Sequence, residues 1–355
     1  MDKTEKLLKD LTEAHGVAGY EDPIRLILKK YLAPLGKLSM DNLGSLICEK
    51  TGSSPSPRVM LAAHMDEIGF MVKYITGEGF IKFTPLGGWF PQFLPGQRVV
   101  IKTHSGDIDG LIVTKIPFTP SDDKKRLIPI EEMFIDIGAI SKEELMQSGV
   151  RIGDPIIPSS EFTILNNKKS YLAKAFDDRV GLGMMVSILQ GLQNHSHPNT
   201  VFAVGTVLEE IGTLGGAITS AQVINPDVAI ILEGVFSGDV QGMKPEDLNL
   251  RLGKGPSIIV NDWRLIPNLK LRDWIIETSE KIDVSIQLST VEGFTDGAAI
   301  HLHNKGVPTV IISVPARYIH SHNGIIYRDD FDQSIELLLA LLTTLDAEVA
   351  ASFRF

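Results

Sequence analysis

Four consecutive stretches decide the fold: VGLGMMVSILQGL (180–192), TVFAVGTV (200–207), GGAITSAQVI (215–224) and VAIIL (228–232). The first and third have the length and composition of helices, and the second and fourth are short, nearly all-apolar runs typical of strands. Strands without a polar face are buried on both sides, as in a sheet covered by helices. We therefore predict an α/β fold with a mixed, mostly parallel sheet flanked by helices.

The same alternation of helices and strands is found towards both ends of the chain. Helical patterns cover Lys3 to Thr12 and a segment that follows Glu21, and strand-like runs follow at Ser45 to Cys48 and at Arg58 to Ala63. Near the other end, the apolar run TVIISV (309–314) precedes the helical pattern FDQSIELLLALLTTL (331–345). Residues 1–70 and 166–355 are therefore expected to form one α/β domain.

The middle of the chain, residues 71–165, has a different character. Glycine, proline and aspartate separate short β-like runs, among them FMVKYI (70–75), QRVVIKTH (97–104), IDGLIVTKI (108–116) and DPIIPSS (154–160). Short strands at this spacing are typical of a small barrel or sandwich. We predict a small β-barrel domain inserted into the α/β domain.

Composition excludes several classes of protein. A length of 355 residues suits about two domains, and the formal net charge of −10 disfavours binding to a nucleic-acid backbone. A run of about 18 apolar residues, which would indicate a membrane span, does not occur in the sequence. The charged first residues do not resemble a secretory signal, and the single Cys48 fits a reducing compartment. We expect a cytoplasmic protein with no nucleic-acid or membrane partner.

Acidic residues and histidines follow the predicted strands in five segments. These are AAHMDEIG (62–69), AFDDRVG (175–181), VLEEIG (207–212), ILEG (231–234) and RYIHSH (317–322). In open α/β sheets the functional site lies beyond the carboxyl ends of the strands, so these side chains are expected to converge.

The first two segments each have an ordinary structural reading beside the functional one. His64 and Asp66 can be a metal ligand and the carboxylate that orients its ring, or they can form a turn that begins a helix. Asp177 and Asp178 precede a helix, where one aspartate commonly serves as the N-cap. A second adjacent carboxylate is explained if one of the two bridges a pair of cations.

The remaining three segments likewise allow both a structural and a functional interpretation. Glu209 and Glu210 repel each other after an apolar strand unless a cation or a proton intervenes, although an exposed charged turn would also tolerate both. Glu233 ends a buried run and needs a partner if it is ionised. His320 and His322 could be ligands or ordinary surface residues. We expect two further histidines of a polar turn not to bind metal: His301 and His303.

Taken together, imidazole and carboxylate groups in five converging segments are the ligands that zinc accepts, and only one thiol competes with them. In order and spacing, AHMDEIGF, AFDDRVG, VLEEIGTLGG and PARYIHSH resemble a family of two-metal aminopeptidases. The family includes glutamyl aminopeptidases and tetrahedral, self-assembling aminopeptidases. The resemblance covers nearly the whole chain, including the β insertion, and it implies a sheet of the zinc-exopeptidase type.

The resemblance also implies a role for each matching position. Two divalent ions, zinc or cobalt with manganese as a further candidate, are expected per subunit. The implied ligands are His64, Asp177, Glu210, Glu233 and His320. Asp177 is expected to bridge both ions, through a cis Asp177–Asp178 peptide as in related folds. Asp66 is the implied orienting partner of His64, and Glu209 is the implied general base.

The chain departs from the family pattern at two places. Glu233 occupies a position that is often aspartate in the family, and His322, Asn323 and Gly324 replace the usual proline and acidic residue. Glutamate at that position is common in related two-metal deacylases and carboxypeptidases, which remain the alternative enzymes. A non-catalytic metal-binding scaffold is a third reading, although every implied ligand and the base are present.

The expected reaction is hydrolysis of N-terminal residues from peptides, by a metal-activated bridging water with a glutamate as base. The inserted barrel resembles the family's dimerisation domain. A homo-oligomer built from dimers is therefore expected, with a twelve-subunit shell as one form. The preferred N-terminal residue does not follow from the sequence.

Overall fold

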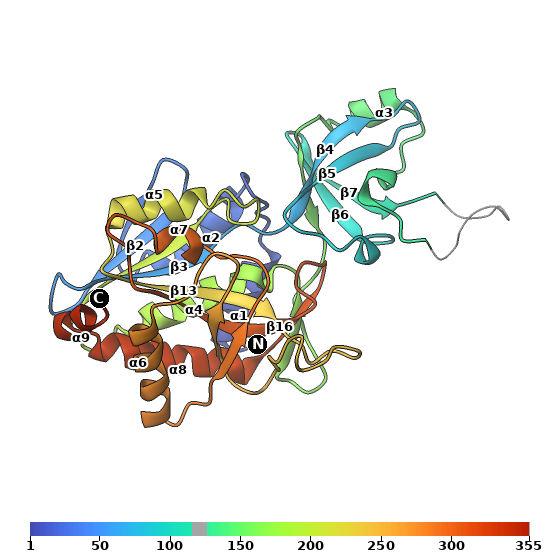
Figure 1. Ribbon diagram of the computed structural model, residues 1–355. Helices are drawn as coiled ribbons and strands as arrows, with labels where there is room; N and C mark the ends of the chain where they lie inside the picture. Colours follow the sequence, from blue (N-terminus) through green and yellow to red (C-terminus); the bar gives the residue numbers. More distant parts are fainter. Residues whose placement is uncertain (116–125, 355) are drawn as a thin grey trace.

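The computed structural model describes residues 1–115 and 126–354. Figure 1 shows two bodies, a large α/β body that contains both ends of the chain and a small barrel that projects from it. The end of the strand predicted over 108–116, and part of the predicted insertion, fall at 116–125, outside the described residues.

An eleven-stranded mixed sheet forms the centre of the large body. Its order is β1-β2-β12-β3-β13-β16-β17-β11-β10, with β14 paired to β16 and β15 paired to β14. The four strands β12, β3, β13 and β16 run parallel, and the strands on either side of them pair antiparallel. The strand bounds are β1 (Lys37–Met40), β2 (Leu46–Thr51), β3 (Arg58–His64), β10 (Thr163–Ile164), β11 (Ser170–Ala173), β12 (Thr200–Thr206), β13 (Val228–Phe236), β14 (Ser257–Asn261), β15 (Gln287–Thr290), β16 (Thr309–Arg317) and β17 (Gly324–Tyr327).

Helices cover both faces of this sheet, which is why its central strands carry almost no polar residue. Successive strand residues point to opposite faces, so Val59 and Leu61 of β3 belong to one core while Met60 and Ala62 belong to the other. Helices α1, α2, α4, α6, α8 and α9 contribute to the first core, and α5 and α7 to the second. The predicted α/β architecture is confirmed.

The predicted helices α1, α2, α4, α5 and α8 begin and end within a few residues of their expected positions, whereas α3, α7 and α9 were not predicted. The bounds are α1 (Lys3–Glu13), α2 (Asp22–Leu32), α3 (Lys142–Gln147), α4 (Phe176–Gly191), α5 (Gly215–Ile224), α6 (Leu269–Lys281), α7 (Gly297–Ile300), α8 (Arg328–Thr344) and α9 (Ala347–Ser352). Helix α1 is fixed by a capping box, in which Asp2 and Glu5 each accept from the other's backbone N–H. None of the described helices is long and apolar enough to cross a membrane.

The small body is a closed six-stranded barrel, which confirms the predicted β-barrel. Its strands follow the order β4-β5-β8-β7-β6-β9 around a core of their own. Their bounds are β4 (Gly69–Ile75), β5 (Ile81–Leu86), β6 (Arg98–Thr103), β7 (Gly106–Val113), β8 (Phe134–Asp136) and β9 (Pro155–Pro158). Strand β10 falls within the range 71–165 that the sequence assigned to the insertion, yet it pairs with β11 of the large sheet.

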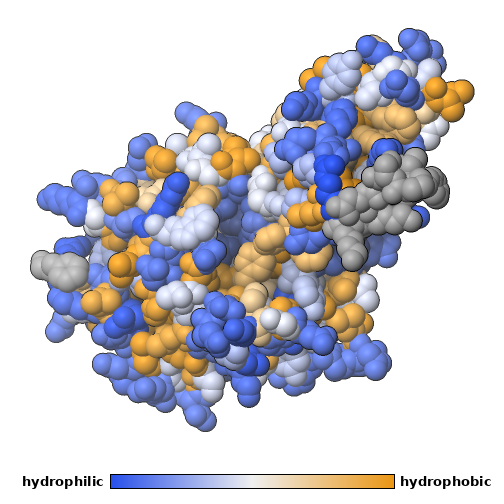
Figure 2. Space-filling view, turned by 45° about the vertical axis from the view of Figure 1, so that its right-hand side comes forward, coloured by the Kyte–Doolittle hydropathy of each residue, from blue (hydrophilic) through white to orange (hydrophobic). Residues whose placement is uncertain are grey.

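The barrel meets the large body beside the carboxyl-terminal edge of the parallel strands. The chain passes from the end of β3 into β4 through only the four residues 65–68. Figure 2 shows hydrophilic and hydrophobic side chains interspersed over one face, with a recess where the two bodies meet.

Candidate active site

The five segments singled out in the sequence come together at this edge of the sheet. His64 ends β3, Glu233 lies in β13, and Asp177 lies in the first turn of α4. Glu209 and Glu210 follow β12, and His320 follows β16. These six side chains line one cavity of about 330 Å³: His64, Asp177, Glu209, Glu210, Glu233 and His320. The convergence expected from strand order is therefore present.

The buried His64 ring lies between its own chain segment and two carboxylates. Its Nδ1 lies 2.9 Å from the backbone oxygen of Asp66. Its Nε2 faces the cavity, 3.0 Å from Asp177 Oδ1 and 3.6 Å from Glu233 Oε1. A hydrogen bond from Nδ1–H to a backbone carbonyl leaves the lone pair of Nε2 free to bind a metal.

The carboxylate of Asp66 has a different set of partners from the one predicted. Its Oδ1 lies 3.7 Å from His64 Nδ1, beyond hydrogen-bond distance. Instead, its two oxygens accept from the backbone N–H groups of Glu209 and Glu210, at 3.1 and 2.9 Å. Asp66 thus orients His64 through its main chain, and its side chain fixes the turn that carries the two glutamates.

The adjacent aspartates Asp177 and Asp178 point to different places, and the peptide bond between them is cis. Asp177 lies between two histidines, with Oδ1 3.0 Å from His64 Nε2 and Oδ2 3.3 Å from His320 Nε2. The backbone at Asp177 and Asp178 is not helical, so the regular part of α4 begins after them, and Asp178 accepts from Gly181 N at 3.0 Å, the hydrogen bond expected of a helix N-cap. One aspartate therefore faces the cavity and the other caps the helix.

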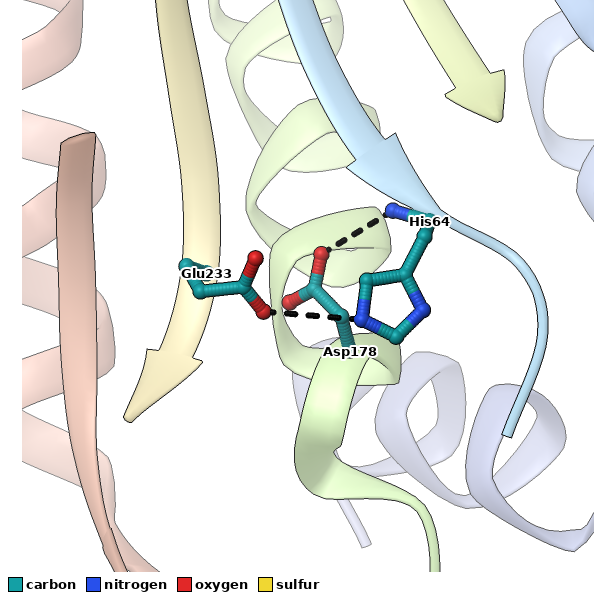
Figure 3. A group of neighbouring side chains, drawn as sticks. All are labelled: His64, Asp178 and Glu233. Carbon is teal, nitrogen blue, oxygen red and sulfur yellow. Dashed lines mark hydrogen bonds and ion pairs between the residues drawn. The ribbon is translucent and has the colours of Figure 1, made fainter. Parts of the chain in front are cut away.

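Asp178 also belongs to the first of two groups of ligand-type atoms. Figure 3 shows it beside His64 and Glu233, where its Oδ2 accepts from the backbone N–H of His64 at 3.1 Å. Sequence reasoning did not assign Asp178 to the site, because capping already explained one of the two aspartates. The second group consists of His64, Asp177 and Glu210, whose ligand atoms all lie within 4.8 Å of one another.

His320 stands at the outer side of the site and contacts the barrel. Its side chain is 25% exposed, against 2% for His64. Its Nδ1 lies 2.6 Å from the backbone oxygen of Gly88, in the segment that follows β5, so Nε2 faces Asp177. Sequence reasoning also missed Gly88, because a backbone carbonyl 232 positions away leaves no signal in the pattern of side chains.

The other histidines of the sequence lie elsewhere. His322 is buried against Trp89, with the two ring centroids 5.4 Å apart. His301 Nδ1 lies 2.7 Å from the backbone oxygen of Gly297, and His303 contacts Asn225. The cavity that holds His64 and His320 is lined by none of these three among the described residues.

The electrostatics of the site indicate a place for cations. Burial, reinforced by neighbouring carboxylates, raises the pKa of Glu210 to about 8 and that of Glu233 to about 7. Burial also raises the pKa of Glu209 well above its usual range. The pKa of Asp177 is lowered although burial opposes this, because both histidines hydrogen-bond to it.

The carboxylates of the site lack cationic partners of the ordinary kind. Within the described part of the chain, the ion pairs of Asp177, Glu209 and Glu233 are formed with histidines alone. Glu210 Oε1 is buried without a hydrogen-bond partner. Buried carboxylates of this kind need cations nearby, and the nitrogen and oxygen donors fit divalent ions such as zinc. The residues present thus fit a metal site.

Comparison with known proteins shows the family to which the chain belongs. The model of the M42 glutamyl aminopeptidase family matches residues 44–337, and a second model, described as AMPT, matches residues 2–28. The chain is 34% identical to a glutamyl aminopeptidase of Lactococcus lactis subsp. cremoris (strain MG1363), covering 98% of each chain. It is 32% identical to a lysyl aminopeptidase of Pyrococcus furiosus, covering 96% of this chain and 97% of the relative.

Solved structures show the same likeness in three dimensions. The TET aminopeptidase of the marine sediment archaeon Thaumarchaeota archaeon SCGC AB-539-E09 superimposes with a TM-score of 0.97 at 41% identity, over 99% of both chains. The TET1 peptidase of Pyrococcus horikoshii, which can assemble into a tetrahedron or a large octahedral shell, gives a TM-score of 0.86 at 31% identity, over 97% of this chain and 100% of that one.

The chain therefore belongs to the M42 glutamyl aminopeptidase family, as its motifs predicted, and it is a hydrolase of the aminopeptidase class.

Proposed function

We propose that this protein removes N-terminal residues from peptides with the help of two divalent metal ions. His64 and Glu233 would hold one ion, Glu210 and His320 would hold the other, and Asp177 would bridge them. The observation that carries the proposal is the position of Asp177, whose two carboxylate oxygens face His64 and His320 at 3.0 and 3.3 Å. The three carboxylates offset three of the four positive charges of two such ions.

Bound at this site, the ions would lower the pKa of the attacking water and polarise the scissile carbonyl group. We assign the role of general base to Glu209. Its carboxylate lines the cavity, 3.9 Å from His64 Nε2, and its backbone N–H is fixed by Asp66. Glu209 accepts a proton from the attacking water and transfers it to the nitrogen of the leaving peptide.

The metals we propose are zinc or cobalt, with manganese as a further candidate. The site offers imidazole nitrogen and carboxylate oxygen atoms, which all three ions accept. The one thiol of the chain, Cys48, is buried in β2 within the core and does not line the cavity. A single cysteine that forms no disulfide fits the cytoplasm, which we propose as the location.

We further propose a homo-oligomer built from dimers through the barrel, with a twelve-subunit shell as its assembled form. Large apolar side chains are exposed on the barrel and in its loops, as at protein–protein interfaces: Leu127, Ile140, Met146 and Ile152. The assembly of the Pyrococcus horikoshii relative into a tetrahedron also supports the proposal. Light scattering of the full chain should give a mass of many subunits, and a monomer at micromolar concentration would contradict it.

The test of the activity uses protein stripped with EDTA, to which zinc, cobalt or manganese is added back. Free aminoacyl p-nitroanilides are assayed for release of p-nitroaniline, N-acetylated amino acids for release of acetate, and N-acetylated dipeptides for release of the C-terminal residue. Cleavage confined to the free amines and restored by metal is the expected result. Release of acetate alone would indicate the deacylase, an alternative that is favoured by glutamate, in place of aspartate, at position 233. Cleavage of C-terminal residues alone would indicate the carboxypeptidase, and bound metal without any turnover would indicate the scaffold.

A further inference from the structure

The cavity that holds the ligand-type side chains has a second, apolar wall. Val235 and Phe236 of β13 lie two and three positions after Glu233, and Ile319 directly precedes His320. Val291 and Phe294, in the segment after β15, line the same cavity and pack against the hydrophobic cluster that contains Val235. The apolar wall is thus built partly by chain neighbours of Glu233 and His320, so a substrate residue whose backbone is held at the proposed ligands would place its side chain beside this wall.

The aromatic members of this wall are held by their own contacts. The Phe236 ring lies 5.5 Å from the His320 ring and 6.1 Å from Phe90, centroid to centroid. The guanidinium of Arg264 stacks over the Phe294 ring, 4.8 Å from its centroid. At about 330 Å³, the cavity lies at the small end of the range for small-molecule pockets, which suits one side chain.

The charge on the apolar wall is negative. Apart from the proposed ligands and Glu209, the charged residue that lines the cavity is the exposed Glu292, and no lysine or arginine among the described residues lines it. The guanidinium groups nearby have other partners, since Arg264 covers Phe294 and Arg317 pairs with Asp239. A carboxylate side chain entering this pocket would meet Glu292, and no lysine or arginine among the described residues lines the pocket to pair with it.

We propose that this pocket selects peptides whose N-terminal residue has an uncharged apolar side chain, such as leucine, methionine or phenylalanine, and that Glu292 acts against acidic residues. The inference rests on the proposed aminopeptidase function and adds the substrate class to it. The family description names glutamyl activity, and this wall offers no cation that a glutamate side chain could pair with.

Basic N-terminal residues take an intermediate place. Their aliphatic stems can lie along the apolar wall while the charged tip stays in water near Glu292. Because Glu292 is exposed, an ion pair formed there contributes little, and added salt weakens it further. The expected order of kcat/KM is therefore leucine, then lysine, then glutamate.

The test measures kcat/KM of the metal-loaded oligomer for leucyl, lysyl and glutamyl p-nitroanilides. Leucine is expected to exceed glutamate by at least about tenfold, as for a side chain with a complementary pocket against one without it. In Glu292→Lys, the ratio of glutamyl to leucyl kcat/KM should rise about threefold to tenfold, the effect of reversing one exposed charge. The rise should shrink at high salt.

The matched control is Glu280→Lys, which makes the same change of charge at an exposed position of α6. It should leave both the activity and the glutamyl-to-leucyl ratio as they are. Cleavage with glutamate preferred, or a ratio that moves equally in both variants, would overturn the pocket assignment while leaving the aminopeptidase proposal intact. No cleavage of any free aminoacyl substrate would overturn both.

Discussion

His64 and His320 both contact Asp177, but the surroundings that hold the two rings differ. His64 ends a central strand, is 2% exposed, and is oriented by the backbone of Asp66, two residues along the chain. His320 follows its strand in a left-handed conformation, with φ of 57°, is 25% exposed, and is oriented by a carbonyl group of the barrel loop. One half of the site is thus built by the large sheet alone, and the other half needs the barrel.

The two histidines are therefore held in place by different kinds of contact within one site. The inner half is fixed by the packing of strands, so its geometry forms together with the hydrophobic core. The outer half is fixed by a contact between two bodies of the molecule. We expect disturbances of the barrel to affect His320 first and His64 last.

The largest effect is expected when the histidines themselves are replaced. His64→Asn should lower kcat/KM at least about a thousandfold, since a lost ligand removes several kcal/mol of transition-state stabilisation. It should also lower the melting temperature of the metal-free protein, because the buried ring hydrogen-bonds to Asp177 and to the backbone of Asp66.

His320→Asn should be inactive as well, but should keep one ion per subunit, and because its ring is 25% exposed it should lower the melting temperature without metal less than His64→Asn does. Metal analysis and calorimetry distinguish the two variants. If both behave alike in metal content and in stability, the contrast between the inner and outer halves is wrong.

The next effect concerns Glu209, which should matter for chemistry and not for either half of the metal site. Glu209→Gln should lower kcat by about 10² to 10⁴, the range for general acid–base catalysis, with both ions retained. Glu280→Gln, at an exposed position of α6, is the control. Near-full activity of Glu209→Gln with metal bound would show that Glu209 is not the general base.

Asp66 connects the halves, because its backbone orients His64 and its carboxylate holds the turn of Glu209 and Glu210. In Asp66→Asn, the amide can replace only one of the two carboxylate oxygens as an acceptor. We expect kcat/KM to fall about tenfold to a hundredfold, as for other partners that orient metal ligands. Steady-state kinetics at saturating metal measure this effect. An unchanged kcat/KM would show that the turn of Glu209 and Glu210 keeps its position without the Asp66 carboxylate.

The smallest effect distinguishes the inner half of the site from the outer half most clearly, because the substitution contacts only the outer half. A Cβ at Gly88 would lie 3.2 Å from His320 Nδ1, so Gly88→Ala should displace the ring slightly and weaken one ion by about tenfold. Gly77→Ala is the matched control in the barrel, since a Cβ there meets no atom within 4 Å. Metal titration followed by calorimetry should show one weakened site in Gly88→Ala and none in Gly77→Ala. Equal weakening of both ions would contradict a separate outer half.

The sequence predicted the parts of the molecule that follow from local pattern. Apolar runs without a polar face placed β12 and β13 in a sheet buried on both sides, and acids or histidines at strand ends located the cavity. The adjacent pair Asp177 and Asp178 was attributed to a cap plus a second function, and the structure divides the pair in that way.

The parts that escaped prediction depend on contacts between distant segments. The hydrogen bonds of the Asp66 carboxylate run to backbone groups more than 140 positions away, and the partner of His320 is a backbone oxygen in the barrel. Main-chain atoms are identical in every residue, so a sequence pattern does not reveal which of them will meet a given side chain. The strand β10 escaped for a similar reason, because its pairing with β11 decides to which body it belongs.

The proposed activity depends on two ions held by His64, His320 and the carboxylates between them. The most direct test titrates zinc or cobalt into the EDTA-stripped oligomer, and follows bound metal per subunit and cleavage of leucyl p-nitroanilide in the same samples. Full activity is expected only at two ions per subunit, with the second ion weaker than the first. Full activity at one ion per subunit, or with no metal bound, would contradict the claim.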